Sequence, residues 1–503
     1  MESPRQTSAW SPLRLFSSPA RMQKLVALLI GVKILISIYD VVRCSPREQH
    51  DYYWHSARTV EAGLVTGKME YDPPLYYVQV WPVEHLLHVP KTNPIPLMRQ
   101  IQVANLAYLV LFYLVTIYGI FPRLVPDERH WALASILLLA LPGYQKLAVM
   151  VHCDNVFAAF CAATLAYWLA MRRREAHPRF KSVVVLAILA GLTGLTRPLA
   201  IGPVFLFWVL AVRGSAIASR DGLGRLSVRR FLARAAIVTS IVGVMSGSWY
   251  VYRWAHSGDV LNAYKSDYIA PFQKYKKDFP WKHYFTTFYF DDLLRHPSRS
   301  LYDLDKHAKG GRNKYANSFF TILYSDFWGD QWLYFTGHRG KGESRFTDKR
   351  RLFVVALPLT LLFVVGLLRG VGSAIARALA SRSFFSPKIV VTALAVGGFA
   401  TYMWWQTGPA LLPGKNSTIK FIYIAFLIPS FIALAASRRL PRKVVTALTA
   451  YALVVFAFAL PVSIWRSTAE AKHASPDEPT ADEEQAARPP PAVKKPPAKH
   501  RKR

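Results

Sequence analysis

Eleven apolar stretches alternate with polar or charged segments along this chain. They cover residues 22–42, 101–121, 130–150, 155–171, 182–196, 198–212, 232–253, 351–368, 389–407, 419–437 and 444–465. Most approach the roughly 20 residues that a helix needs to cross about 30 Å of hydrocarbon. The pattern therefore predicts an all-α polytopic membrane protein with about eleven transmembrane helices.

Two parts of this pattern need interpretation. The first stretch follows basic residues, as a signal peptide does, but it is longer than a signal h-region and lacks a small-residue cleavage site, so we expect an uncleaved helix. The stretches 182–196 and 198–212 are short and Arg197-Pro198 separates them. We expect a hairpin with its turn near the outer surface, and one long kinked helix is the alternative.

Lys and Arg gather in alternate short loops, which sets the orientation. Placing these basic loops and the N-terminus in the cytoplasm leaves the opposite side with large loops at 43–100 and 254–350, short turns at 151–154 and near Arg197, and a loop at 408–418. The transmembrane domain then covers 1–465. The charged, Pro- and Ala-rich tail 466–503 is predicted to be disordered, and its late basic residues disagree with an outer location.

Composition supports the membrane class and excludes others. Of 503 residues, 52% are hydrophobic, more than one soluble core normally accommodates. The net charge of +33 comes from short runs between apolar segments rather than from one basic face, so nucleic acid is not an expected partner. The absence of a Walker loop or a dinucleotide fingerprint argues against a nucleotide-driven pump. Cys44 and Cys153 both map outside and could pair.

The first outer loop contains an acid and a histidine at helical spacing. Asp51 and His55 are four residues apart, so on a helix they share a face. A carboxylate there could accept a proton from a hydroxyl, and the imidazole could orient it or hold a metal. Glu48 and Asp40 are competing acids. The alternative is that these are solvated residues beside an aromatic belt at the membrane interface.

A rigid element follows in the same loop. Asp72 precedes Pro73-Pro74, which exclude helix at that point, and the aromatic pair that begins at Tyr76 comes next. Alone, this pattern is typical of a turn.

Arg197 stands alone between two apolar stretches on the side that otherwise lacks bases. Arginine at such depth is a functional-site hypothesis, with phosphate as its natural bidentate partner, and snorkelling to lipid headgroups is the alternative. His152 and Asp154 lie in another short outer turn and could converge on the same cavity. Asp154 could equally cap a helix that begins near Val156.

Other outer segments contain aromatic and basic residues that could bind a sugar or a lipid. The aromatic runs at 246–259 and 320–335 suit either sugar stacking or a membrane interface. Lys415 and Lys420, near the start of the stretch 419–437, could meet an anionic lipid head.

Several short motifs follow one another along the chain. They are an acid followed by Y-x-x-x-A-R, then P-P-L-Y-Y, D-N, G-L-T-R-P, W-Y-x-Y-R-W-x-x-x-G-D and K-F-I-Y. This order resembles the membrane glycosyltransferases of the C-type (GT-C) fold, in particular the family of dolichyl-phosphate-mannose protein mannosyltransferases and bacterial lipid A aminoarabinose transferases. It covers about residues 25–440. The family's first loop usually carries an Asp-Glu pair where this chain has His50-Asp51, which leaves open which acid is the base.

The resemblance implies a polyprenyl-phosphate sugar as donor and an extracytoplasmic lipid, glycan or protein as acceptor. It makes Asp51 the candidate base, with Glu48 and His55 as further catalytic candidates. Arg197, with Lys415 or Lys420, becomes the ligand of the donor phosphate, and Asp154, Asp72 and Tyr76 are expected in the same substrate site.

Other implications concern mechanism, cofactor and location. We expect inversion at the anomeric carbon, and no certain cofactor, although Asp51, His55 and His152 could hold a divalent metal. The expected location is a bacterial plasma membrane, with the active site facing outward among membrane lipids. A transporter or flippase for a lipid-linked or anionic solute is the alternative function, and a noncatalytic member of the fold is a third.

Overall fold

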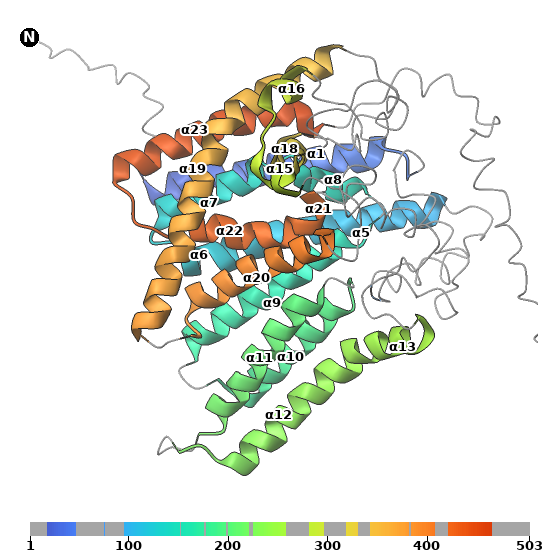
Figure 1. Cartoon of the computed structure of the whole chain (residues 1–503), viewed down its shortest axis with the longest axis vertical. Helices are drawn as coiled ribbons and strands as arrows, with labels where there is room; N and C mark the ends of the chain where they lie inside the picture. The colour runs from blue at the N-terminus through green and yellow to red at the C-terminus, as the bar shows by residue number, and fades with distance from the viewer. Residues whose placement is uncertain are drawn as a thin grey trace, which may run out of the picture.

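The structure, a computed structural model, describes residues 18–46, 75, 95–150, 152–175, 178–197, 200–220, 225–257, 281–295, 318–329, 343–381, 384–407 and 421–464. Within these ranges all regular elements are helices, and the only β pairing is an isolated bridge between Arg220 and Leu226. The all-α prediction is therefore confirmed for the described part of the chain. Figure 1 shows most of the long helices running side by side as a bundle.

Each predicted apolar stretch carries helix. The first half of the bundle contains α1 (Pro19–Arg43), α5 (Ile95–Leu114) continued by η4 (Val115–Ile120) and α6 (Phe121–Leu124), α7 (Glu128–Ala140), α8 (Gly143–Val149), α9 (Asp154–Arg174), α10 (Phe180–Gly194), α11 (Ile201–Ala218), and α12 (Val228–Val242) continued by η6 (Gly243–Gly247) and α13 (Ser248–Ser257). The second half contains α19 (Glu343–Ser381), α20 (Pro387–Thr407), α21 (Phe421–Ile424), η8 (Ala425–Leu427), α22 (Ile428–Ala435) and α23 (Arg442–Ser463). Three short helices precede α19: α15 (Trp281–Thr286), α16 (Phe290–Arg295) and α18 (Phe319–Trp328).

The sequence predicts eleven membrane spans, but fewer helices are long and apolar enough to cross a membrane. Among the described residues seven helices are long and apolar enough, or eight if α7 and α8 together form one span. These two helices meet at a bend of 56° next to Pro142, which has no N–H to continue the helix. The helix α10 and the segment 425–435 are apolar but short. The polytopic class is confirmed, and the difference in number comes from the bent α7–α8 pair, from the two short helices and from α20, which has the length of a span but is not among the seven.

The segments on either side of Arg197 form a hairpin. A Cβ added to Gly214 would approach Val183 to 3.0 Å, and one added to Gly194 would approach Val204 to 3.2 Å. The start of α10 therefore lies beside the end of α11, as antiparallel packing requires. The hairpin is confirmed and the single kinked helix is wrong.

Loops assigned to one side by their basic residues meet at one end of the bundle. Arg123 experiences the charges of Arg173 and Arg174, and Lys388 donates to the carbonyl of Ser437 at 3.1 Å. At the other end Arg99 donates to the carbonyl of Cys44 at 2.9 Å. The grouping of the loops thus agrees with the predicted topology, and which end faces the cytoplasm stays a prediction.

Cysteine labelling tests that orientation. A cysteine placed at Gly310 should react with an impermeant maleimide from outside, whereas one at Arg220, an exposed residue at the basic end, should react only after permeabilisation. The native Cys44, Cys153 and Cys161 form no disulfide with one another, unlike the pairing considered above, and all three are buried, which keeps the background low. Reversed labelling would contradict the assigned sides.

A buried polar network joins α1 to its neighbours. The Gln145 side chain donates to Ser37 Oγ at 2.7 Å and to the carbonyl of Lys33 at 3.1 Å, while Lys33 Nζ donates to Ser463 Oγ at 3.3 Å. Asp40 is fully buried in α1, so this acid does not compete for the role of loop base. The network fixes α8, whose C-terminal end leads directly into the site described next.

Candidate functional site

The turn between α8 and α9 is shaped by amide side chains from α5. Gln102 donates to the carbonyl of Val149 at 2.7 Å, and Asn105 donates to the carbonyl of Met150 at 2.6 Å. These bonds satisfy carbonyl groups that the end of a helix leaves without intrahelical partners. They hold residues 152–154 at one end of the bundle.

Asp154 is the first residue of α9, and its carboxylate is fully buried. The N-cap residue is Cys153, with no side-chain capping bond, so the capping interpretation of Asp154 is wrong. The carboxylate instead forms ion pairs with Arg197 and with Nδ1 of His152, the latter at 2.6 Å. A negative charge is also favoured at a helix N-terminus.

Arg197 lies between α10 and α11 with only 7% of its surface exposed. In addition to its ion pair with Asp154, its guanidinium lies over the ring of Tyr423, 4.3 Å from the ring centroid. The side chain is buried against Asp154 of α9 and Tyr423 of α21, so the snorkelling alternative is wrong. The predicted convergence of His152, Asp154 and Arg197 is confirmed. Figure 1 labels the helices that carry or flank these residues, which are α9, α10, α11 and α21.

One described residue of the first loop, Leu75, reaches this site. The backbone N–H of Leu75, the residue after Pro74, donates to the carbonyl of Leu195 at 3.1 Å. Leu195 is two positions before Arg197, so the loop contacts the turn that carries the arginine. Asp72 and Tyr76 flank Leu75 in the sequence but lie outside the described residues, as do five other candidates: Glu48, Asp51, His55, Lys415 and Lys420. Their roles stay predictions.

A second buried ion pair is linked to the site through the start of α21. Lys146 and Asp326 have fully buried side chains, and Lys146 Nζ is 2.7 Å from Asp326 Oδ1. The other carboxylate oxygen accepts the backbone N–H of Phe421 at 2.5 Å. This carboxylate therefore joins α8 to α18 and to the start of α21, two residues before Tyr423.

Sequence reasoning missed this pair, although one signal was present. Lys146 falls inside the predicted stretch 130–150, and an ionisable residue within a span normally has a partner or a function.

Two aromatic residues near Asp326 in α18 belong to the core. Tyr324 donates to the carbonyl of Phe353 at 2.5 Å, and Trp328 donates to Thr360 Oγ1 at 2.7 Å. Both rings are buried against α19, and burial, with the nearby Tyr451, raises the pKa of the Tyr324 phenol, which stays neutral. These two aromatics are neither a sugar platform nor an interface belt.

His152, Cys153 and Asp154 have the geometry of a partial metal site. Their ligand atoms lie within 4.8 Å of one another and offer nitrogen, sulfur and oxygen, a set that suits zinc. However, the Asp154 carboxylate already holds a guanidinium. A divalent cation there would have to displace Arg197 or repel it.

The fold and the site define a helical protein with several candidate membrane spans and a buried arginine–carboxylate–histidine cluster at one end. No family model matches the chain, and no curated protein does. Among solved structures it is similar to ArnT from Cupriavidus metallidurans bound to undecaprenyl phosphate, with 14% identity, 87% of this chain and 78% of that chain covered, and a TM-score of 0.32. The apo structure of the same protein gives 14% identity, coverage of 83% and 78%, and the same score. Likeness at this level carries no argument about activity or residues.

Proposed function

We propose that this chain is a GT-C glycosyltransferase that moves a sugar from a polyprenyl-phosphate donor to an extracytoplasmic lipid, glycan or protein. The observation that carries the proposal is the buried Arg197, which is paired with Asp154 at a helix-hairpin turn whose Leu195 accepts a hydrogen bond from Leu75 of the first loop. The motif order along the sequence supports it independently.

Arg197 suits the donor phosphate for electrostatic reasons. In the proposed reaction an acceptor oxygen bonds to the anomeric carbon while the bond from that carbon to the phosphate oxygen breaks, and the electron pair leaves with polyprenyl phosphate. Negative charge therefore grows on the phosphate in the transition state. A preorganised guanidinium in a water-poor site stabilises that charge more than it stabilises the ground state.

Asp154 and Tyr423 are the proposed positioning residues for this arginine. Guanidinium has five donors in a planar fork, so one edge can remain on the carboxylate while another binds phosphate. The ring of Tyr423 covers one guanidinium face and limits its rotation. We assign Lys415 or Lys420 as a further phosphate ligand, and Asp51 as the base that takes the acceptor proton in an inverting displacement.

The alternative, transport or flipping of a lipid-linked or anionic solute, also has observations in its favour. The span formed by α7 and α8 is bent by 56°, and helix 421–435 is interrupted by a short 3-10 segment. Bent helices and buried ionisable groups are common in transporters.

One experiment separates the two functions: purified protein in liposomes is supplied with a panel of polyprenyl-phosphate sugars. A transferase releases polyprenyl phosphate, whereas a flippase moves the intact donor between leaflets without cleaving it.

Arg197 variants test the phosphate site. We expect Arg197→Ala to raise the apparent donor requirement roughly 10- to 150-fold, the value of a charge-assisted hydrogen bond, and Arg197→Lys to restore part of it. Because Arg197→Ala leaves the Asp154 carboxylate without its arginine, a double variant with Arg197→Gln and Asp154→Asn removes both charges and protects folding. Arg439→Ala, an exposed arginine near the other end, is the matched control. Unchanged donor dependence in folded Arg197 variants would contradict the assignment.

Metal removal tests the competing use of Asp154. We propose that Asp154 serves Arg197 rather than a cation, so dialysis against EDTA should leave donor cleavage unchanged. Loss of cleavage that Zn²⁺ or Mg²⁺ restores would instead assign His152, Cys153 and Asp154 to a metal.

A further inference from the structure

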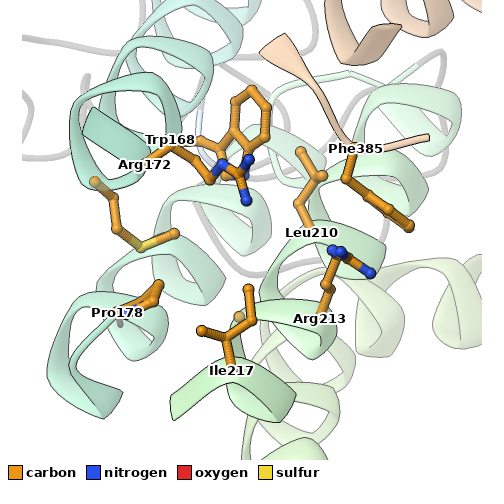
Figure 2. Close-up of a pocket in the computed structure, with 9 residues that line it drawn as sticks. Trp168, Arg172, Pro178, Leu210, Arg213, Ile217 and Phe385 are labelled. Atoms are coloured by element: carbon orange, nitrogen blue, oxygen red, sulfur yellow. The ribbon is translucent and has the colours of Figure 1, made fainter. Parts of the chain in front are cut away.

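A second site with arginines lies at the opposite end of the bundle from Arg197. It is a pocket between the last turns of α9 and α11, closed on one side by the residue Phe385 that precedes α20 (Figure 2). Its walls include Trp168, Leu210 and Ile217, and Arg172 and Arg213 extend into it from two different helices. The proposed sugar-transfer reaction uses none of these residues.

The two arginines bring positive charge to a pocket without a compensating acid. Arg213 experiences the charges of both Arg172 and Arg220. Among the described residues neither Arg172 nor Arg213 forms an ion pair or donates a hydrogen bond, and the contact of Arg213 is with the face of the Phe385 ring, 4.0 Å from its centroid. The nearest acid along α9, Glu175, accepts bonds from the Arg179 backbone N–H and from Ser182, both at 2.8 Å.

Like charges at this position oppose the packing that the helices require. The start of α10 packs closely on the end of α11 through Gly214 and Val183, which keeps the arginine-bearing turns together. An anion between Arg172 and Arg213 would remove the repulsion. Phosphate is the anion whose geometry matches two guanidinium groups best.

The position of the pocket identifies the source of that phosphate. Arg172 is close to the C-terminal end of one candidate span, and Arg213 is in the last turns of another, so both lie where a bilayer presents its headgroups. The apolar walls offer nothing to a free phosphate ion but can contact the methylenes of a lipid. We infer that this pocket binds the headgroup phosphate of one anionic phospholipid at the basic face of the bundle. The inference does not depend on the proposed transferase activity.

Thermal stability of the delipidated protein in detergent provides the test. Three probes are titrated: dihexanoyl phosphatidylglycerol, dihexanoyl phosphatidylcholine and inorganic phosphate. We expect a saturable rise in Tm with phosphatidylglycerol only. The double variant with Arg172→Gln and Arg213→Gln should weaken the apparent affinity at least about tenfold, as the loss of charge-assisted bonds predicts.

Arg173→Gln with Arg174→Gln is the matched control, because it removes two positive charges from the same end of the bundle but from residues that do not line the pocket. Its response should equal that of the parent. Native mass spectrometry should show one tightly retained phosphatidylglycerol in the parent and control and none in the pocket variant. Equal weakening in both double variants, an equal response to phosphatidylcholine, or an equal response to inorganic phosphate would each overturn the proposal.

Discussion

Replacing Lys146 with methionine is expected to lower the free energy of unfolding by about 3–5 kcal/mol, because it leaves a buried carboxylate without its cation. Both members of the pair are completely enclosed, at an N–O distance of 2.7 Å. Asp326→Leu should cost a similar amount, since it strands the ammonium and also removes the acceptor of the Phe421 N–H. Thermal or denaturant unfolding in detergent measures the change.

A double-mutant cycle separates the ion pair from general packing. With both residues made apolar, no unpaired charge remains, so the combined Lys146→Met and Asp326→Leu variant should be more stable than the two single losses predict by addition. The exposed residues Lys443 and Asp291 supply matched controls, because Lys443→Met and Asp291→Asn should each stay within about 0.5 kcal/mol of the parent. Additive losses in the cycle would contradict a direct pair.

This pair also connects stability to the candidate site. Asp326 holds the N–H of Phe421, and two residues later Tyr423 packs on the guanidinium of Arg197. The ring of Phe421 additionally packs edge-on against Tyr144 in α8. A variant that loosens the pair should therefore disturb the environment of Arg197 through Phe421 and Tyr423.

Much of the helical architecture was predictable, because apolar runs of span length have few alternatives in a membrane. The convergence of His152, Asp154 and Arg197 followed from topology: two very short turns on one side of a bundle leave their polar residues close together. What the sequence could not show was the partner of Asp154. The carboxylate could have capped its own helix, and only the packing of α9 against the α10–α11 hairpin decides for Arg197.

The Lys146–Asp326 pair shows why other parts were not predictable. Its members are 180 residues apart, and the segment around Asp326 was assigned to a large outer loop. Aromatic density in that segment suited both sugar binding and a membrane interface, whereas α18 packs its aromatic face into the core beside α19. Local composition does not distinguish these outcomes, since all three favour Tyr and Trp.

Variants of the first-loop acids identify the catalytic base. Asp51→Asn is expected to reduce turnover by roughly 10²- to 10⁴-fold while donor binding survives. Asparagine keeps the size and hydrogen-bonding capacity of aspartate but cannot accept the acceptor's proton. Glu48→Gln tests the nearest competing acid, and Asp72→Asn, beside the predicted Pro-Pro turn, should be milder. These effects are measured as polyprenyl phosphate release under saturating donor. If Glu48→Gln is inactive and Asp51→Asn is not, Glu48 is the base. Normal turnover in all three variants would rule out acid residues of the first loop as the catalytic base.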